Sequence, residues 1–401
     1  MIATAGSADA KRTMATTVLL CFLVAVVEGF DIQAIGVAAP RLAPELGLSS
    51  GALGWIFSIG NVGFVVGAFG GGWLADRIGR KPVFIAAVLL FGLFTLATTI
   101  TQTFLPLLVV RLLAGLNFGA ALPIMMAVAA EVTTPGRRSL TASMMFCGMP
   151  FGGGLSALLT QAFPADFDWR LLFYIGGAIP IALVPVLWVM LPETLKPAAQ
   201  VAAKRVSTWT ALFGGGRAPA TLLLWATFLP TLIILYLILN WLPTLVAAIG
   251  IDASIAPQAS LAFNFASIAG ALLLGKLVDR YGARWPLTLA YIGLVLSLIA
   301  LSQSDEITAI LFLSGAAGFF LLGANYALYG VAPVFYDTEI RGTGSGASIA
   351  VGRVGAIVGP ALAGMLLSSG LSASGVVAYM IPVAAVAGIA VFALSFCRPR
   401  G

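Results

Sequence analysis

The sequence predicts an all-α polytopic membrane protein with about twelve transmembrane helices in two six-helix halves. Three observations support this fold class. The composition is 60% hydrophobic and only 9% charged, whereas a soluble domain carries roughly 25% charged residues. Apolar runs of about 20 residues, the length that crosses a bilayer, recur along the whole chain. A short charged motif also occurs twice, about half a chain apart.

The apolar runs define the expected spans one by one. Lys11 and Arg12 precede the first run and no small-residue cleavage site follows it, so we expect a retained helix and not a signal peptide. The expected spans are residues 14–40, 51–75, 83–103, 105–131, 139–163, 169–191, 220–248, 255–278, 286–303, 305–333, 341–367 and 375–396.

The basic residues predict the orientation, because Lys and Arg collect in cytoplasmic loops. Of the 21 Lys and Arg residues, all but four fall on one side if the N-terminus is inside. Arg41 and Arg170 lie in outside loops, and Arg111 and Arg353 lie within spans. We therefore expect a multi-pass protein of the cell inner (plasma) membrane with cytoplasmic N- and C-termini. The net charge of +6 then marks topology and not nucleic-acid binding.

The repeated motif predicts how the chain is divided. Gly72-Trp-Leu-Ala-Asp-Arg-Ile-Gly-Arg follows the second span, and Gly275-Lys-Leu-Val-Asp-Arg-Tyr-Gly-Ala-Arg follows the eighth, 203 residues later (72 to 275). Such duplication is typical of transporters with parallel repeats. We expect an N-terminal six-helix half over 1–191, a cytoplasmic linker over 192–219 that is rich in Pro, Ala and Gly, and a C-terminal six-helix half over 220–401.

Two acids in the first span are the strongest functional candidates. Glu28 and Asp31 are three residues apart and share one face of the helix with Gln33 nearby. An acid at mid-bilayer depth costs at least about 2.5 kcal/mol by insertion scales, so it is expected to face a protein interior or a watery cavity. The alternative for each acid is a fixed pair with a membrane arginine.

The motifs resemble a known family. Gly72-x-x-x-Asp76-Arg77-x-Gly79-Arg80-Lys81 is similar to the signature loop of the major facilitator superfamily. Glu28-Gly29-Phe30-Asp31 is similar to the first-helix Asp-Gly-x-Asp motif of its aromatic acid/proton symporters, with Glu in place of the first Asp. Further similar segments begin at Arg111, Trp169, Asn240, Arg341 and Gly352. The resemblance implies the major facilitator fold and transport of an aromatic acid with protons.

Proton coupling needs a titrating group, and the chain has no histidine. A buried carboxylate is the substitute, with Asp31 ranked first and Glu28 second because the extra methylene of Glu28 departs from the family motif. Arg111, in the fourth span, is expected from its family role to couple with these acids; the alternative is that it snorkels to the outer interface.

Arg353 lies about twelve residues into the eleventh span, near mid-membrane at 1.5 Å per residue. It either offers a fork to the substrate carboxylate or pairs with Asp31 or Glu28, and the resemblance favours the first. The remaining substrate candidates are polar or aromatic residues that interrupt apolar spans. They are Gln33, Tyr236, Asn240, Trp241, Asn264, Asn325, Tyr326 and Tyr329.

Charged residues at the inner loops are the candidate gates, because ion pairs there can latch one conformation of two rocking halves. The alternative is that they only set topology. The candidates are Asp76, Arg77, Arg80, Glu131, Arg138, Asp279, Arg280 and Arg341.

These expectations combine into a proton-coupled symporter that imports a small aromatic carboxylate, phenylpropionate- or hydroxybenzoate-like, by alternating access at a site between the halves. Its partners are the aromatic acid anion, protons and the lipid bilayer, without nucleic acid, and we expect a monomer. One alternative is a proton antiporter that exports small aromatic compounds, since Gly148-Met149-Pro150-Phe151-Gly152 resembles an antiporter motif. The other is a membrane chemosensor for aromatic acids, which would require a signalling extension.

The sequence offers no sign of enzymatic chemistry. No nucleophile–base pair or cofactor motif occurs, so we expect neither an enzyme nor a bound cofactor. Cys21, Cys147 and Cys397 are scattered, which supports neither a disulfide framework nor a metal site.

Overall fold

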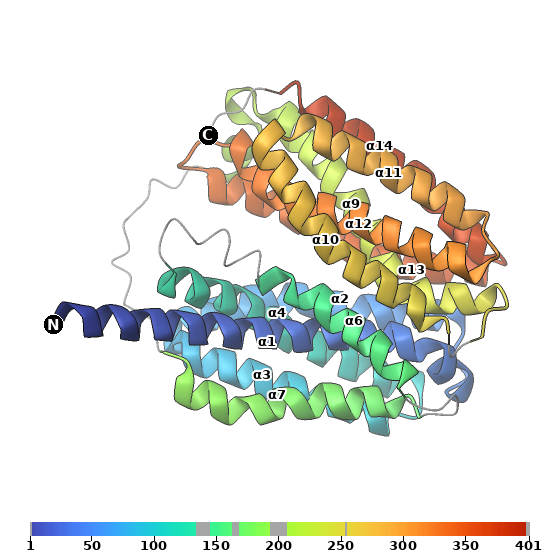
Figure 1. Cartoon of the computed structure of the whole chain (residues 1–401), viewed down its shortest axis with the longest axis horizontal. Coiled ribbons are helices and arrows are strands. Elements are labelled where there is room, and N and C mark those ends of the chain that lie inside the picture. Colours follow the sequence, from blue (N-terminus) through green and yellow to red (C-terminus); the bar gives the residue numbers. More distant parts are fainter. Residues whose placement is uncertain (1, 134–144, 163–167, 193–206, 253–254, 398–401) are drawn as a thin grey trace. The chain divides into compact units, whose positions relative to one another are not determined.

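The computed structural model describes residues 2–133, 145–162, 168–192, 207–252 and 255–397. Within these ranges the chain forms helices joined by short loops and contains no strand (Figure 1). The helices are α1 (Ile2–Glu45), α2 (Ser50–Ile78), α3 (Arg80–Ala97), α4 (Phe104–Val132), α6 (Gly148–Gln161), α7 (Arg170–Met190), α8 (Thr208–Phe213), α9 (Ala218–Ala248), α10 (Pro257–Tyr281), α11 (Arg284–Ser302), α12 (Ile307–Val331), α13 (Arg341–Ser368) and α14 (Ala373–Leu394), with 3₁₀ turns η1 (Thr98–Ile100), η3 (Gly214–Gly216) and η4 (Ala332–Phe335).

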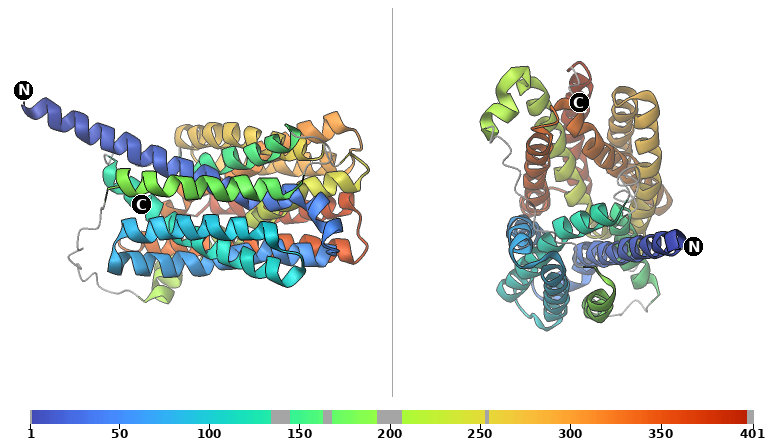
Figure 2. Two further views of the ribbon diagram at one scale, coloured as in Figure 1. Left: turned by 90° about the horizontal axis from the view of Figure 1, so that it is seen from below. Right: turned by 90° about the vertical axis from the view of Figure 1, so that its left-hand side faces the viewer.

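Eleven of the described helices are long and apolar enough to cross a membrane, which confirms the predicted all-α polytopic fold class. The fifth expected span, 139–163, corresponds to α6, and its first residues lie outside the described ranges. Helix α1 has 44 residues and is therefore about 66 Å long at 1.5 Å per residue. Its apolar part begins at Met14, and Figure 2 shows its N-terminal turns extending beyond the neighbouring helices of the same unit.

The chain divides into two compact units. Unit 1 contains Met1–Leu48 and Ile59–Gln200, and unit 2 contains Ser49–Ser58 and Val201–Gly401. The division near the middle of the chain lies inside the expected linker, but the first turns of α2 group with unit 2. Within the described part of that linker, the chain forms α8 and η3.

The helix ends repeat with one offset, which extends the duplication beyond the charged motif. Equivalent ends are 203 residues apart (248 − 45, 307 − 104 and 373 − 170). The three pairs are the last residues of α1 and α9, Glu45 and Ala248, and the first residues of α4 and α12, Phe104 and Ile307, and of α7 and α14, Arg170 and Ala373.

Two glycines of the repeated motif have the same structural role. Gly79 follows α2 with φ 105°, and Gly282 follows α10 with φ 77°. A side chain is strained at such positive φ values, so glycine is the residue that allows each helix to end in a sharp turn. In both units, the glycine after the helix therefore allows the backbone turn that ends the helix.

Glycines inside the helices allow close packing within each unit. A Cβ atom on Gly67 of α2 would overlap the backbone of Leu116 in α4, and one on Gly119 of α4 would overlap the backbone of Phe64 in α2. In unit 2, Gly355 and Gly359 of α13 lie in the same way against the backbone of α9. Small residues let membrane helices approach closely, so these glycines form packing surfaces.

Candidate functional site

Unit 1 contains a buried ion pair between Asp31 of α1 and Arg111 of α4. Arg111 donates to both carboxylate oxygens, at 3.1 Å to Oδ2 and 3.4 Å to Oδ1. Thr95 of α3 donates to Asp31 Oδ1 at 3.0 Å. The two charged side chains are only 7% and 5% exposed. Removing two charges from water is expensive, and such a pair persists only with good geometry and further hydrogen bonds.

The Arg111 guanidinium has two further neighbours in unit 1. Its Nη2 donates to the hydroxyl of Thr98 in η1 at 2.8 Å, and its Cζ lies 5.2 Å from the centre of the Phe173 ring in α7. Four elements, α1, α3 with η1, α4 and α7, therefore surround one charge pair. Arg111 points into the unit, toward the first-helix acid.

Glu28 lies one turn before Asp31 and has a very different environment. It is 2% exposed, and neither carboxylate oxygen has a hydrogen-bond partner. The small cavity beside it is apolar, lined by Val24, Val27, Val88, Phe91, Phe118, Ala121, Pro180 and Leu183. An unpaired charge in such a place costs far more than a neutral group. This arrangement suits a carboxyl group that holds a proton.

The repeat provides an internal comparison for Glu28. Thr231 of α9 lies 203 residues later in the chain (231 − 28), and its hydroxyl is hydrogen-bonded to the hydroxyl of Tyr291 in α11 at 2.5 Å. Helix α11 is the counterpart of α3, which contributes the apolar side chains of Val88 and Phe91 to the cavity beside Glu28. The same position therefore contains a satisfied neutral pair in unit 2 and an unsatisfied acid in unit 1.

Gln33, the third polar residue on this stretch of α1, is also buried. Its amide packs against α6 at Gly153, where a Cβ atom would overlap the Gln33 side chain. The glycine-rich face of α6 thus gives Gln33 its space. Its assignment as a substrate contact stays a prediction.

In unit 2, Arg353 of α13 and Tyr236 of α9 come together. Arg353 Nη1 donates to the Tyr236 hydroxyl at 2.8 Å. Tyr329 of α12 lies close enough to both for electrostatic interaction, and its ring centre is 5.6 Å from that of Phe228. The structure therefore places one cation beside two phenol groups and the Phe228 ring. A cation, phenol groups and an aromatic ring are the groups that would bind an aromatic carboxylate.

The other predicted substrate residues in unit 2 differ in whether their polar groups already have hydrogen-bond partners within the protein. Asn240 and Asn264 each donate to the backbone carbonyl four residues earlier, at 2.7 and 2.8 Å. Trp241 is fully buried, and its indole N–H donates to the Pro360 carbonyl at 2.9 Å. Asn325 is buried with no partner for Oδ1, and Tyr326 is half-buried. Among these groups, the amide oxygen of Asn325 is a buried acceptor without a hydrogen-bond partner.

The candidate gating residues lie at the helix ends of the repeated motif. Asp76, Arg77, Asp279 and Arg280 are exposed. Arg77 lies over the Trp73 ring at 3.9 Å, and Arg280 over Tyr281 at 5.3 Å. Arg80 is half-buried at the start of α3. Arg341 Nη2 donates to Thr338 Oγ1 at 3.4 Å. Arg138 and the Glu131 side chain lie outside the described residues. Their gating roles stay predictions.

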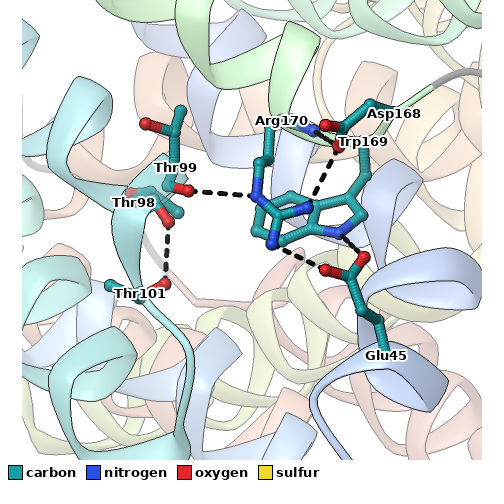
Figure 3. A network of polar contacts seen from close by, with 7 residues as sticks. All are labelled: Glu45, Thr98, Thr99, Thr101, Asp168, Trp169 and Arg170. Carbon is teal, nitrogen blue, oxygen red and sulfur yellow. Dashed lines mark hydrogen bonds and ion pairs between the residues drawn. The ribbon is translucent and has the colours of Figure 1, made fainter.

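A polar network at the end of unit 1 was not anticipated from the sequence (Figure 3). Glu45, the last residue of α1, accepts from Arg170 Nη2 at 2.6 Å and from the Trp169 indole at 2.7 Å. Arg170 also donates to Asp168 at 3.3 Å and, through Nε, to the Thr99 carbonyl of η1 at 3.1 Å. The Thr95 and Thr98 hydroxyls were missed as well, although their spacing of one turn on an apolar helix was a usable signal.

A duplicated helical bundle with buried charges in its spans defines a polytopic membrane transporter. The profile of the Major Facilitator Superfamily matches residues 21–261 and 246–401. The chain belongs to the Major Facilitator Superfamily, a family of transporters and not of enzymes.

Known proteins resemble the chain along nearly its whole length. It is 42% identical to the 3-(3-hydroxy-phenyl)propionate transporter of Escherichia coli, covering 98% of this chain and 97% of that protein. It is 33% identical to the 4-hydroxybenzoate transporter of Pseudomonas aeruginosa, covering 93% and 91%. The crystal structure of a bacterial homolog of the human lysosomal transporter Spinster matches the fold with a TM-score of 0.79, at 17% identity over 96% of each chain. The resemblance to aromatic acid transporters expected from the motifs is confirmed.

Proposed function

We propose that this protein is a proton-coupled symporter that imports a small aromatic carboxylate by alternating access. The observation that carries the proposal is Glu28, a fully buried acid without a hydrogen-bond partner in an apolar cavity. A carboxyl group in that environment is neutral, and it becomes charged only when the conformation brings water or a cation to it. It can therefore take up a proton on one side of the membrane and release it on the other.

The adjacent pair completes the coupling site. Asp31 has partners in Arg111 and Thr95 and Glu28 has none, so in this proposal Glu28 is the acid that carries the proton. This exchanges the order expected from the sequence, in which Asp31 ranked first. Release of the Glu28 proton requires a compensating cation, and Arg111, which pairs with Asp31 one turn further along α1, is the candidate.

The substrate class rests on Arg353 and on the relatives. Arg353, with Tyr236 and Tyr329, combines a guanidinium fork for a carboxylate with phenol groups for a ring hydroxyl. The relatives are transporters of hydroxyphenylpropionate and hydroxybenzoate, which are aromatic acids of this kind. We propose a phenylpropionate- or hydroxybenzoate-like substrate.

Energetics favour coupling to protons. A negative-inside potential opposes entry of one negative charge by roughly 2.3 kcal/mol per 100 mV. One co-transported proton cancels the charge of the substrate, and more than one makes the potential a driving force. The termini then lie in the cytoplasm of a cell whose plasma membrane maintains that potential, as the distribution of Lys and Arg predicts.

The test is uptake of 3-(3-hydroxyphenyl)propionate and 4-hydroxybenzoate into proteoliposomes that contain a pH-sensitive dye. Symport predicts that the lumen becomes more acidic as the acid enters, and that the corresponding amides are not transported. Outward proton movement during substrate entry would support the antiport alternative. Binding without any flux would support the chemosensor alternative.

A further inference from the structure

The network at the end of unit 1 reaches the buried ion pair through a single turn of chain. Thr99 and Thr98 are neighbours in η1. The Thr99 carbonyl accepts from Arg170 Nε at 3.1 Å, and the Thr98 hydroxyl accepts from Arg111 Nη2 at 2.8 Å. One peptide unit therefore separates a bond to the partly exposed network from a bond to the buried pair.

The turn η1 is bonded on one side to the end of α3, where the Thr99 hydroxyl donates to the Leu96 carbonyl at 2.7 Å and the Thr98 N–H caps the helix. It is a three-residue 3₁₀ turn between α3 and α4, and such turns leave backbone carbonyls without partners inside the helix. The Thr101 hydroxyl donates to the Thr98 carbonyl at 2.7 Å, and the Thr98 hydroxyl donates to the Phe94 carbonyl at 3.3 Å. The second bond directs the remaining lone pairs of the Thr98 oxygen toward Arg111. Arg170 adds a bond from α7 to the Thr99 carbonyl on the other side of the turn.

The network is more than a surface ion pair. An exposed pair contributes little to stability, about 0–1 kcal/mol, and here the Glu45 side chain is 45% exposed and that of Arg170 is 23% exposed. However, Glu45 also accepts from the indole of Trp169, a residue only 2% exposed. Arg170 stacks over that indole at 4.4 Å. Three elements, the end of α1, the start of α7 and η1, thus meet in one fixed geometry (Figure 3).

We propose that Arg170 and Glu45 are positioning residues for the Arg111–Asp31 pair, because they hold η1 where the Thr98 hydroxyl supports the Arg111 guanidinium. This inference rests on the proposed coupling role of that pair. Loss of the network lets η1 move, removes the Thr98 bond from Arg111 and weakens its hold on Asp31. The Asp31 carboxylate then lacks a fixed cation, and coupling is lost although substrate binding in unit 2 is intact.

The experiment compares Arg170→Gln, Thr98→Val and the double variant in proteoliposomes. Each single variant is expected to lower the maximal rate of proton-driven uptake about tenfold with little change in KM. The double variant is expected to be no slower than the slower single variant, because both changes break one chain of contacts. Thr98→Ser retains the hydroxyl and is expected to retain the rate. Lys276→Gln is the matched control, because it removes an exposed cation of α10 in unit 2, outside this network.

A second readout separates this inference from the proposed function. In infrared spectra, the carboxylate stretching band that is lost in Asp31→Asn is expected to shift in Arg170→Gln, because the hydrogen bonds from Arg111 to that carboxylate weaken. That shift supports the positioning role even if transport proves not to be proton-coupled. Its absence, or a double variant slower by the product of the single effects, overturns the inference. Full rescue by the charge exchange Glu45→Arg with Arg170→Glu also overturns it, because a glutamate cannot donate to the Thr99 carbonyl.

Discussion

Arg111 donates to both carboxylate oxygens of Asp31, at 3.1 and 3.4 Å, inside unit 1. The same helix presents Glu28 one turn earlier, with no partner for either oxygen. One acid is thus neutralised by a cation, and the other is neutral only if it carries a proton. This division between two neighbouring acids is the basis of the first two predictions.

Glu28→Gln is expected to abolish accumulation driven by an inward proton gradient while leaving substrate exchange intact. The amide has the size of the protonated acid but cannot release a proton. Accumulation should fall at least about tenfold, equivalent to about 1.4 kcal/mol, in a proteoliposome uptake assay. The control is Glu306→Gln, an exposed acid before α12. Unchanged accumulation in Glu28→Gln would contradict the assignment.

Asp31→Asn is expected to destabilise the protein strongly, because it leaves the Arg111 charge buried without its counterion. Removing one member of a buried pair costs about 3–5 kcal/mol. The apparent Tm in detergent measures this loss. Asp31→Asn with Arg111→Gln removes both charges and should recover much of the lost stability. A double variant no more stable than the single variant would show that the pair contributes little.

Arg353→Lys is expected to weaken binding of an aromatic carboxylate, since lysine lacks the planar fork. A loss of about tenfold in Kd corresponds to one charge-assisted hydrogen bond, about 1.4 kcal/mol. Tyr236→Phe, which removes the hydroxyl that contacts Arg353, should have a smaller effect. Thermal-shift titration with the acid and its amide measures both, with the exposed Arg280→Lys as control. Equal affinities for acid and amide in the unmodified protein would exclude an arginine anchor.

Gly67→Ala is expected to destabilise unit 1, because the added Cβ meets the Leu116 backbone in α4. Overpacking of this kind costs about 1–3 kcal/mol. Gly72→Ala, five residues later in the same helix, has open space at its Cβ and should leave the apparent Tm unchanged. Similar values for the two variants would indicate that α2 and α4 adjust freely.

Thr231→Val and Tyr291→Phe test the neutral pair that occupies the Glu28 position in unit 2. Thr231→Val leaves the buried Tyr291 hydroxyl without this partner, at a cost of about 1–3 kcal/mol. Tyr291→Phe should cost less, because the Thr231 hydroxyl also donates to the Thr227 carbonyl. The double change removes both hydroxyls and should cost less than the two single changes together. Apparent Tm values for the three variants give the coupling directly, and additive losses would mean that the 2.5 Å contact adds no stability.

Hydropathy and the repeated motif were sufficient to predict the fold class, because spans of about 20 apolar residues and a positive-φ glycine are local features. The partner of Asp31 was not predictable in the same way. Glu28 and Asp31 share one helix face, and only the position of Arg111 on a different helix decides which of them is paired. Sequence reasoning selected all three residues but ranked the two acids differently from the proposal made here.

The packing of two tryptophans near span ends was not predictable from the sequence. Trp169 and Trp241 are both buried and donate their indole N–H within the protein, although a tryptophan near a span end is typical of an interface anchor. The role of Glu45 was not predictable either, because an acid at the end of a span resembles an ordinary solvated charge. Its role depends on the meeting of α1, α7 and η1, which no local pattern encodes.

The Thr231–Tyr291 pair shows that a six-helix unit of this design can fill the Glu28 position with hydrogen-bonded neutral side chains. Unit 1 instead keeps an unsatisfied acid there, together with a desolvated ion pair beside it. Proteins carry such defects where activity requires them, at the expense of thermal resistance. Unit 1 should therefore be the first part of the chain to lose its structure on heating, and hydrogen exchange at rising temperature should reach the amides of α1 and α4 before those of α9 and α12.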